Sequence, residues 1–375
     1  MASIINFPMR VKQIIRYTKS KLSEIRNHGS LNAAGIRNAK IQESGCKVSS
    51  TDSTTDSVHE DPFFFIHIPK TAGTSFRMAA ENSFGLKSIE KNYGPKSAHT
   101  TTLARKYLVE QSDIFGFHQQ FKCSNTRMYT GHVDAVPMAY VLPMTRMVTF
   151  LRKPVDQVIS HYNHSVRWHG SKKSIEEFCR FPGFRDIQAT RLRYIPIQLM
   201  GIIGLTENYK HSLEMFNHIY GTELPFLIEN VNDDKKIEVP DKDTLALIKK
   251  MNTADVALYD VAQRLFCQRY EMYKQNLPWC HGAIQEQNDT HLAGYACWAH
   301  SDDPVELILS SSGQDIAETR AIHPKPFLSR FVLPRHGIIG FIFTISNLKD
   351  RENLEVRVKS TGQKLEKQFI PEPHS

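Results

Sequence analysis

The stretch that decides the fold reads Phe63-Phe64-Phe65-Ile66-His67-Ile68-Pro69-Lys70-Thr71-Ala72-Gly73-Thr74-Ser75-Phe76. Its first half is a short apolar run rich in strand-forming residues, which is typical of a strand buried on both faces of a parallel sheet. Thr74 or Ser75 can cap a helix that continues through Phe76. The stretch therefore predicts a buried strand, a loop and the start of a helix.

The loop between this strand and helix has the chemistry of an anion site. A helix N-terminus presents several backbone N–H groups and a positive potential to one point. Lys70 adds a point charge, Gly73 lets the backbone approach a ligand, and hydroxyls come from Thr71, Thr74 and Ser75. The pattern is not G-x-x-x-x-G-K-[ST], so it does not imply an ATPase or GTPase loop. Taken alone, an ordinary strand–helix turn explains it equally well.

A second strand–loop–helix pattern lies at residues 147–162. Met147–Leu151 is a short apolar run, and Pro154 opens an apolar-periodic helix. Arg152 follows the strand at the edge where open α/β sheets bind ligands, and Ser160 lies about two helical turns further on. An Arg and a hydroxyl facing one crevice form a clamp for a phosphate dianion, while the alternative is an Arg in an ion pair at a strand end.

Strands and helices alternate over residues 62–280. A further strand is predicted at Leu224–Ile228, and the region Asp241–Tyr273 is largely helical. This order predicts an α/β fold of the P-loop-like, three-layer kind with a central parallel sheet. Beyond it, residues 291–360 are predicted to form a small accessory β-sandwich from four short runs: Gly294–Trp298, Val305–Ser310, Ile338–Ile345 and Leu354–Val358.

The net charge of +8 is concentrated at one end of the 375-residue chain. Residues 1–48 hold nine Lys or Arg and two Glu, and a Ser/Thr/Asp-rich segment follows. Residues 1–61 are therefore predicted to be a basic tail and linker. A solvated arm and an interfacial helix on an anionic membrane both remain open. Nucleic acid is not expected as a partner, because the arm lacks interleaved aromatic residues.

The sequence gives no sign of export or of a membrane span. It has no run of about 18 apolar residues and no apolar signal segment near its start. Six scattered cysteines without C-x-x-C spacing predict neither a zinc ribbon nor a disulfide framework. We therefore expect a cytoplasmic protein, with peripheral membrane contact through the arm as an option.

Together, the two loop patterns resemble those of the sulfotransferases that use 3′-phosphoadenosine 5′-phosphosulfate (PAPS), in particular the carbohydrate branch that includes heparan sulfate 2-O-sulfotransferase. In that family an I-P-K-T-x-G-T-S loop holds the 5′-phosphosulfate, and L-R-[DN]-P-x-x-R-x-x-S-x-Y holds the 3′-phosphate. The resemblance covers residues 62–275 and implies that Arg152 and Ser160 bind the 3′-phosphate. It assigns the 5′-phosphosulfate to Lys70, Thr71, Ala72, Gly73, Thr74 and Ser75.

The chain departs from the family pattern at two positions. Lys153 replaces the usual acid after the Arg, and Gln157 replaces the second Arg. Weaker echoes of the family are Gly204-Leu205-Thr206-Glu207 and Asp255-x-x-Leu258-Tyr259. The C-terminal module loosely resembles the β-sandwich domains appended to bacterial glycan-modifying transferases.

A third motif, Tyr129-Thr130-Gly131-His132-Val133, precedes Arg152 by about twenty residues. In the 2-O-sulfotransferase-like branch a Gly-His at this place carries the catalytic base, which His132 matches. An imidazole titrating near pH ~6.5 suits the removal of a proton from an attacking hydroxyl. A turn with a structural His is the alternative, and Asp134 and Glu81 are reserve candidates for the base.

The predicted function is sulfuryl transfer from PAPS to a hydroxyl of a carbohydrate, with His132 as general base and Lys70 stabilising the leaving group. No metal is expected, because sulfuryl carries less charge than phosphoryl. His161, His164 and His169 are close in sequence, but no carboxylate or Cys completes a ligand set. The alternatives are a catalytically silent nucleotide- and glycan-binding protein and a nucleotide-dependent kinase, which would need Mg²⁺ and its carboxylate ligands.

Overall fold

The computed structural model describes residues 62–227, 240–346, 348 and 353–372. The predicted tail of residues 1–61 lies outside these ranges. The described residues group into one compact unit. Within the described residues, no helix combines the length and the apolar character that a membrane span requires.

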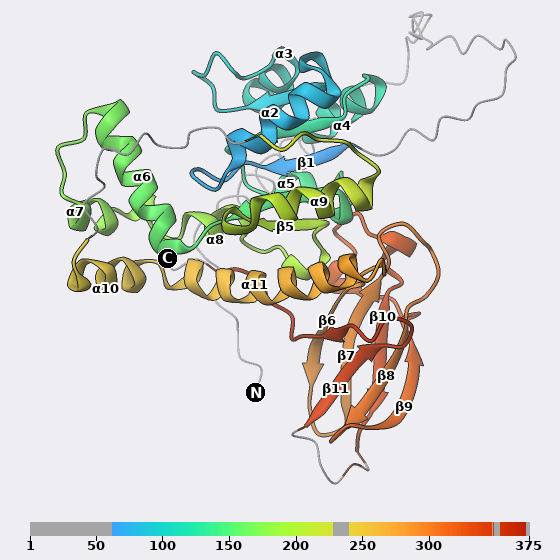
Figure 1. The fold of residues 1–375 in the computed structure, drawn as a ribbon. Coiled ribbons are helices and arrows are strands. Elements are labelled where there is room, and N and C mark those ends of the chain that lie inside the picture. Colours follow the sequence, from blue (N-terminus) through green and yellow to red (C-terminus); the bar gives the residue numbers. More distant parts are fainter. Residues whose placement is uncertain (1–61, 228–239, 347, 349–352, 373–375) are drawn as a thin grey trace, which may run out of the picture. The chain divides into compact units, whose positions relative to one another are not determined.

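The described residues form a five-stranded parallel sheet in the order β2-β3-β1-β4-β5. Its strands β1 and β5 are labelled in Figure 1. Each strand is short, and β1, β3, β4 and β5 are buried along their whole length, as expected for strands covered on both faces. The five are β1 (Phe63–Ile66), β2 (Ile89–Asn92), β3 (Met128–Gly131), β4 (Met147–Leu151) and β5 (Ile202–Leu205).

Aromatic contacts show that helices cover both faces of this sheet. Phe64 and Phe65 are neighbours on β1, so their side chains point to opposite faces. Phe65 contacts Phe76 of α2 (Gly73–Phe84), with ring centroids 4.6 Å apart. Phe64 stacks on Tyr129 of β3, which contacts Phe117 of α4 (Ile114–Cys123) at 5.0 Å. The predicted three-layer α/β fold with a central parallel sheet is confirmed.

The remaining helices lie in the segments between these strands and in the segment that follows β5. The predicted helical region at 241–273 is divided by Asn252 into α10 and α11. The helices are α3 (Thr102–Ala104), a π-helical segment (Arg105–Glu110), α5 (Val136–Ala139), α6 (Pro154–His169), α7 (Ile175–Arg180), α8 (Ile187–Leu192), α9 (Tyr209–Tyr220), α10 (Lys242–Met251) and α11 (Thr253–Lys274). Single 3-10 turns lie at 86–88, 144–146, 182–184, 197–199, 206–208, 326–328 and 334–337.

The strand predicted at Leu224–Ile228 is wrong over its described part, because residues 224–227 form no strand. Leu224 is buried, which produces the apolar signal, but its backbone is already bonded to a side chain. Asn217 accepts from the Leu224 N–H (2.9 Å) and donates to the Leu224 carbonyl (3.0 Å), so neither group can join a ladder. The sheet is instead completed by β5.

The C-terminal residues form a β-module (His281–Leu365) of two antiparallel sheets, ordered β10-β7-β6 and β12-β11-β8-β9. Apolar side chains from both sheets, including Phe341 and Leu307, share one core. The strands are β6 (His281–Gln287), β7 (His291–Cys297), β8 (Glu306–Ser311), β9 (Gln314–Arg320), β10 (Gly340–Thr344), β11 (Leu354–Val358) and β12 (Lys364–Leu365). They extend beyond residues 291–360 at both ends.

A buried arginine joins α11 to the chain that precedes β5. Arg269 is 2% exposed and donates to the carbonyls of Gln198 (2.9 Å), Met200 and Gly201 (both 3.0 Å). Its guanidinium also lies 3.2 Å from His281 Nδ1 at the start of the β-module. These bonds fix α11 against the parallel sheet.

Candidate functional site

The loop between β1 and α2 has an unusual backbone. Lys70 and Ala72 both adopt left-handed conformations, with φ values of 68° and 64°. Between them, the buried Thr71 hydroxyl donates to the carbonyl of Ile68 (2.9 Å) and closes the turn. The helix begins at Gly73 with Ala72 as its N-cap, so the predicted cap at Thr74 or Ser75 is wrong. The loop therefore sets the direction of the backbone N–H groups in the first turn of α2, which make no hydrogen bond within the helix.

Gly73 is required here by packing. A Cβ at this position would lie 2.1 Å from Cδ2 of the His67 imidazole. His67, the first residue after β1, is itself buried. Gly73 thus lets the helix start directly against the His67 ring. The sequence suggested a different reason for this glycine, namely close approach of a ligand to the backbone.

Arg152 is fixed at the end of β4 by a residue that the sequence did not single out. The buried Gln188 of α8 accepts from the Arg152 N–H (2.9 Å) and donates to the Arg152 carbonyl (3.0 Å). The Arg152 Nη1 in turn donates to the carbonyl of Lys70 (3.3 Å). The two loops that carry the candidate phosphate ligands are therefore in direct contact.

Gln157, one of the two departures from the family pattern, links α6 to the loop between β1 and α2 by a hydrogen bond. It is buried on α6, and its Nε2 donates to the carbonyl of Pro69 (3.0 Å). Ser160 lies half-buried one helical turn further along α6. No hydrogen bond joins Ser160 to Arg152 among the described residues, so their joint role as a phosphate clamp stays a prediction.

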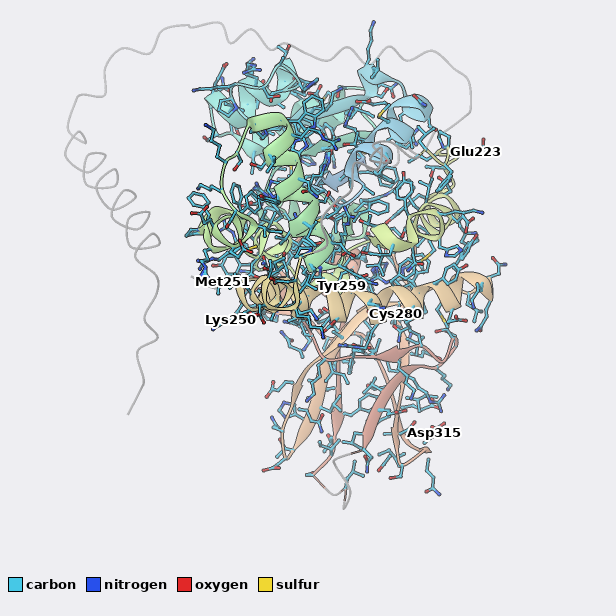
Figure 2. The ribbon with its side chains drawn as sticks, turned by 60° about the vertical axis from the view of Figure 1, so that its left-hand side comes forward. Glu223, Lys250, Met251, Tyr259, Cys280 and Asp315 are labelled. Atoms are coloured by element: carbon cyan, nitrogen blue, oxygen red, sulfur yellow. The ribbon has the colours of Figure 1, made fainter. Side chains whose placement is uncertain are left out.

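The two segments that weakly resemble the family, 204–207 and 255–259, support the backbone on either side of Arg152 through hydrogen bonds. Thr206 donates to the Leu151 carbonyl (3.0 Å), and Glu207 accepts from the Lys153 N–H (2.8 Å). Tyr259, labelled on α11 in Figure 2, donates to Glu207 (3.0 Å). The strand end is therefore held by residues from the 3-10 turn after β5 and from α11.

Asp255, at the start of α11, supports Arg152 indirectly by bonding to the backbone of α8. Its carboxylate accepts from the N–H groups of Gln188 (3.3 Å) and Ala189 (2.7 Å). Burial, opposed by these hydrogen bonds, raises the pKa of Asp255 to about 7. Asp255 thus holds the helix turn that carries Gln188, and through it Arg152.

Positive charge gathers where the two loops meet. Burial, and then the charges of Arg152 and Arg167, lower the pKa of Lys70. Within the part of the chain that the structure describes, no carboxylate pairs with Lys70 or Arg152. Such a site attracts a ligand with several negative charges.

His132 directly follows β3, and its N–H donates to the carbonyl of Asn92 (3.2 Å). Its ring lies edge-on to two others, with centroids 4.9 Å from His67 and 4.8 Å from Tyr93. The residue keeps an exposed surface, yet its partial burial and the charges of Arg191 and His161 lower the pKa of His132 to about 4. His132 is therefore a neutral imidazole at pH 7, able to accept a proton.

The reserve bases are both engaged by cations. Glu81 pairs with Arg77 (2.6 Å) and Lys91 (2.9 Å). Burial opposes its ionisation, but the bonds from Lys91 and Arg77 prevail and lower the pKa of Glu81. Asp134 pairs with Arg191 (2.9 Å) and Arg193 (2.6 Å). This arrangement favours His132 over either carboxylate as a base.

His161 lies within electrostatic reach of both His132 and Lys70. It lies on α6, and burial, followed by repulsion from His164, Lys70 and His169, lowers its pKa to about 4. The charge of His161 acts on His132 as well, so the three groups are within electrostatic reach of one another. Among the described residues, no cluster of three or more His, Cys, Asp or Glu side chains could hold a metal ion.

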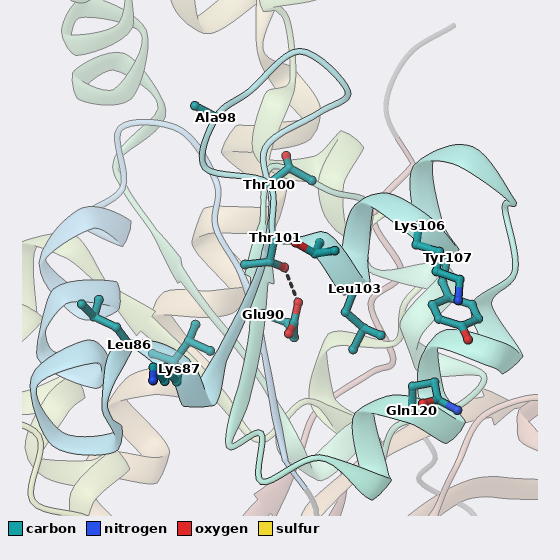
Figure 3. Close-up of a pocket in the computed structure, with 12 residues that line it drawn as sticks. Leu86, Lys87, Glu90, Ala98, Thr100, Thr101, Leu103, Lys106, Tyr107 and Gln120 are labelled. Atoms are coloured by element: carbon teal, nitrogen blue, oxygen red, sulfur yellow. Dashed lines mark hydrogen bonds between the residues drawn. The ribbon is translucent and has the colours of Figure 1, made fainter. Parts of the chain in front are cut away.

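An open hollow of about 700 Å³ lies beside the edge strand β2 (Figure 3). Its lining is mixed in character, and Thr101 donates to Glu90 inside it. None of the candidate site residues lines it, although Thr100 does, and the Thr100 hydroxyl accepts from the Tyr93 N–H (3.1 Å). The hollow borders the candidate site but does not form it.

The sequence relatives of this chain are local. The chain matches no protein-family model. It is 36% identical over 80 residues to heparan-sulfate 6-O-sulfotransferase 1 of Homo sapiens and of Mus musculus, which is 21% of this chain and 19% of each relative. The chain thus spans about a fifth of the length of these curated relatives.

One solved structure, a sulfotransferase from Alicyclobacillus acidocaldarius, aligns with 54% of this chain and 96% of its own. The identity is 16% and the TM-score is 0.31, which is too low to show a shared fold. The similar curated proteins are 6-O-sulfotransferases, so the expected 2-O branch is not confirmed. Over that local stretch of sequence, the curated proteins that this chain resembles are sulfotransferases.

Proposed function

We propose that this protein transfers a sulfuryl group from PAPS to a hydroxyl of a carbohydrate. The observation that carries the proposal is the meeting of two loops, in which Arg152 Nη1 donates to the Lys70 carbonyl. It joins the motif that resembles a 5′-phosphosulfate loop to the motif that resembles a 3′-phosphate site. The local similarity to heparan-sulfate 6-O-sulfotransferases supports both the sulfuryl donor and a carbohydrate acceptor.

In the proposed reaction the donor is held at its two ends. Arg152 and Ser160 bind the 3′-phosphate, with the Arg152 backbone fixed by Gln188. The 5′-phosphosulfate is held by Lys70, Thr71, Ala72, Gly73, Thr74 and Ser75, through the Lys70 ammonium, the hydroxyls and the amides of the first helical turn. The left-handed backbone at Lys70 and Ala72 aims these groups before the donor arrives.

His132 accepts the proton of the acceptor hydroxyl as that oxygen attacks sulfur. The neutral state of its imidazole at pH 7 suits this role. The bond from sulfur to the bridging oxygen breaks, and Lys70 with the loop amides stabilises the charge that develops on that oxygen. The products are a sulfate ester, the 3′,5′-bisphosphate and a protonated His132.

The test uses ³⁵S-labelled PAPS and a panel of glycans with the full chain. Wild-type protein should transfer label. His132→Ala should lower kcat by ~10²–10⁴-fold, the range for a lost general base, while binding the 3′,5′-bisphosphate as tightly as wild type. Lys70→Ala should lower kcat by ~10²–10³-fold. The matched controls are His291→Ala on β7 and Lys249→Ala on α10, which lie outside both loops and should transfer at the wild-type rate.

Three results would overturn parts of the proposal. Equal transfer by wild type and His132→Ala would remove His132 as the base. Binding of the bisphosphate with no label transfer to any glycan would favour the silent binding protein. Phosphoryl transfer from ATP that requires Mg²⁺ would make the protein a kinase.

A further inference from the structure

A buried histidine lies between the candidate base and the donor loop. His67 is 7% exposed, and its Nδ1 lies 2.8 Å from the hydroxyl of Tyr93, a residue 26 positions further along the chain. Burial, and then the charges of His132, Arg77 and Lys70, hold the pKa of His67 well below its ordinary value. Burial raises the pKa of Tyr93 to about 12. The bond therefore joins two neutral groups at physiological pH.

His67 and Tyr93 both contact the ring of His132. The planes of His67 and His132 cross at 76°, and those of Tyr93 and His132 cross at 83°. Such edge-to-face contacts restrict ring rotation, and here the two contacting rings are bonded to each other. The orientation of His132 is therefore set by a pair of side chains and not by one neighbour.

The same imidazole is the surface against which the donor loop packs. The His67 ring occupies the space where a side chain on residue 73 would begin. It also stacks on Phe65 of β1 (5.6 Å between centroids), which ties it to the central sheet. Movement of His67 would displace the start of α2 on one side and His132 on the other.

We infer that His67 and Tyr93 are positioning residues that hold the His132 base in register with the loop that binds the sulfuryl donor. This inference rests on the proposed function, since it concerns the same reaction. The hydrogen bond between Tyr93 and His67 keeps the two rings in place around His132. A 1 Å displacement of a reacting group can cost about 100-fold in rate, so losing the Tyr93–His67 hydrogen bond should change kcat measurably.

The test is Tyr93→Phe, which removes the hydroxyl but keeps the ring. We expect kcat to fall about 10-fold while the Kd of the 3′,5′-bisphosphate stays within about twofold of wild type, because the donor loop keeps its contact with His67. Tyr140→Phe is the matched control, since Tyr140 is 48% exposed and its ring stacks on Phe331, away from His132. This control should retain the wild-type kcat.

Two further readouts separate positioning from a general structural defect. In a His132→Ala background, Tyr93→Phe should have no additional effect on kcat. In protein with ¹³C-labelled histidine, the His132 ring signal, identified by its loss in His132→Ala, should broaden or shift in Tyr93→Phe and not in Tyr140→Phe. The NMR measurement needs no catalysis, so it tests the positioning of the His132 ring even if no sulfuryl transfer is found.

Either of two outcomes overturns the inference. One is an unchanged kcat and an unmoved His132 signal in Tyr93→Phe. The other is an equal loss of kcat on adding Tyr93→Phe to wild type and to His132→Ala, which would mean that Tyr93 does not act through His132. Failure of the proposed function itself would be seen separately, as absence of label transfer by the wild-type protein.

Discussion

The two loops that meet at the candidate site are stabilised to different degrees by distant parts of the chain. The first loop, residues 67–73, is shaped mainly by its own left-handed backbone, the Thr71 hydroxyl and the contact of Gly73 with His67. From outside it, Arg152 and Gln157 donate to its backbone carbonyls. The second loop, residues 151–157, depends on side chains from the turn after β5, from α8 and from α11. The comparison shows that most of the first loop's conformation is encoded locally, whereas the second loop is fixed mainly by distant parts of the chain.

The largest effect is expected from Gly73→Ala, which disrupts the first loop. The new methyl group would lie 2.1 Å from the buried His67 ring, so either the helix start or the ring must move. We expect kcat/KM for PAPS to fall at least about 100-fold and the free energy of unfolding to fall by about 1–3 kcal/mol. Steady-state kinetics and urea denaturation measure the two effects.

A compensating change tests the cause of this loss. His67→Ala combined with Gly73→Ala removes the ring that the methyl group meets. We expect the double variant to regain binding of the 3′,5′-bisphosphate relative to Gly73→Ala, but not kcat, because His132 then lacks a positioning ring. If the double variant binds no better than Gly73→Ala, the steric explanation is wrong.

A smaller effect is expected from Gln188→Leu, which disrupts the second loop from outside. The substitution keeps the side-chain volume but removes both hydrogen bonds to the Arg152 backbone. We expect the donor KM to rise about 10-fold, as for the loss of one or two buried hydrogen bonds, with kcat nearly unchanged. Gln119→Leu, on the exposed side of α4, is the control. A fall in kcat at constant KM would contradict a binding role.

A third, pH-dependent effect is expected from Asp255→Asn. The pKa of Asp255 is about 7 in the folded protein, above its ordinary value of 3.8, so the folded state binds the proton more tightly. The contribution of this group to stability is therefore present below about pH 4 and is lost as the pH rises through about 7. We expect the difference in free energy of unfolding between wild type and Asp255→Asn to shrink from pH 5 to pH 8.

The quantity to measure is the difference in free energy of unfolding between wild type and Asp255→Asn at each pH. Histidines with lowered pKa, such as His132 and His161, give the opposite dependence on pH, but they are common to both proteins and cancel. Asp260→Asn, exposed on the same helix, should follow wild type at every pH. A constant difference between wild type and Asp255→Asn would show that Asp255 does not titrate in this range.

The smallest effect is expected from Lys153→Ala, at the position where the family pattern has an acid. The Lys153 side chain is exposed, and the loop uses its backbone N–H, which donates to Glu207. We expect the donor KM to stay within about twofold of wild type, because an alanine retains that N–H. A larger change would show that the Lys153 charge contributes to donor binding.

Residues 62–76 and 147–162 could be interpreted from the sequence because their signals are local. A buried strand, a loop and a helix start follow one another within fifteen residues, and both units are present in the structure. Gly73, Arg152 and Gln157 were visible for the same reason. The contacts of Gln157 and the ring that Gly73 meets could not be seen, since both depend on the folded arrangement.

The missed residues are those that reach the site from far along the chain. Gln188 is 36 residues from Arg152, and Tyr93 is 26 residues from His67. Neither carries a motif, and only the pairing of β2 with β3 and the packing of α8 bring them to the site. The wrong strand at 224–228 has a related cause, because the Asn217 side chain satisfies the backbone of Leu224.

The left-handed conformation of Ala72 has a consequence for how this loop tolerates change. Such a conformation costs an alanine about 1 kcal/mol, and a glycine there would escape this cost but lose a similar amount through its freer unfolded chain. Ala and Gly are thus close to equivalent at position 72, whereas position 73 accepts no atom beyond its backbone. An exchange of Ala for Gly at position 72 should therefore leave the stability of the loop nearly unchanged, whereas any side chain at position 73 must displace the start of α2 or the His67 ring.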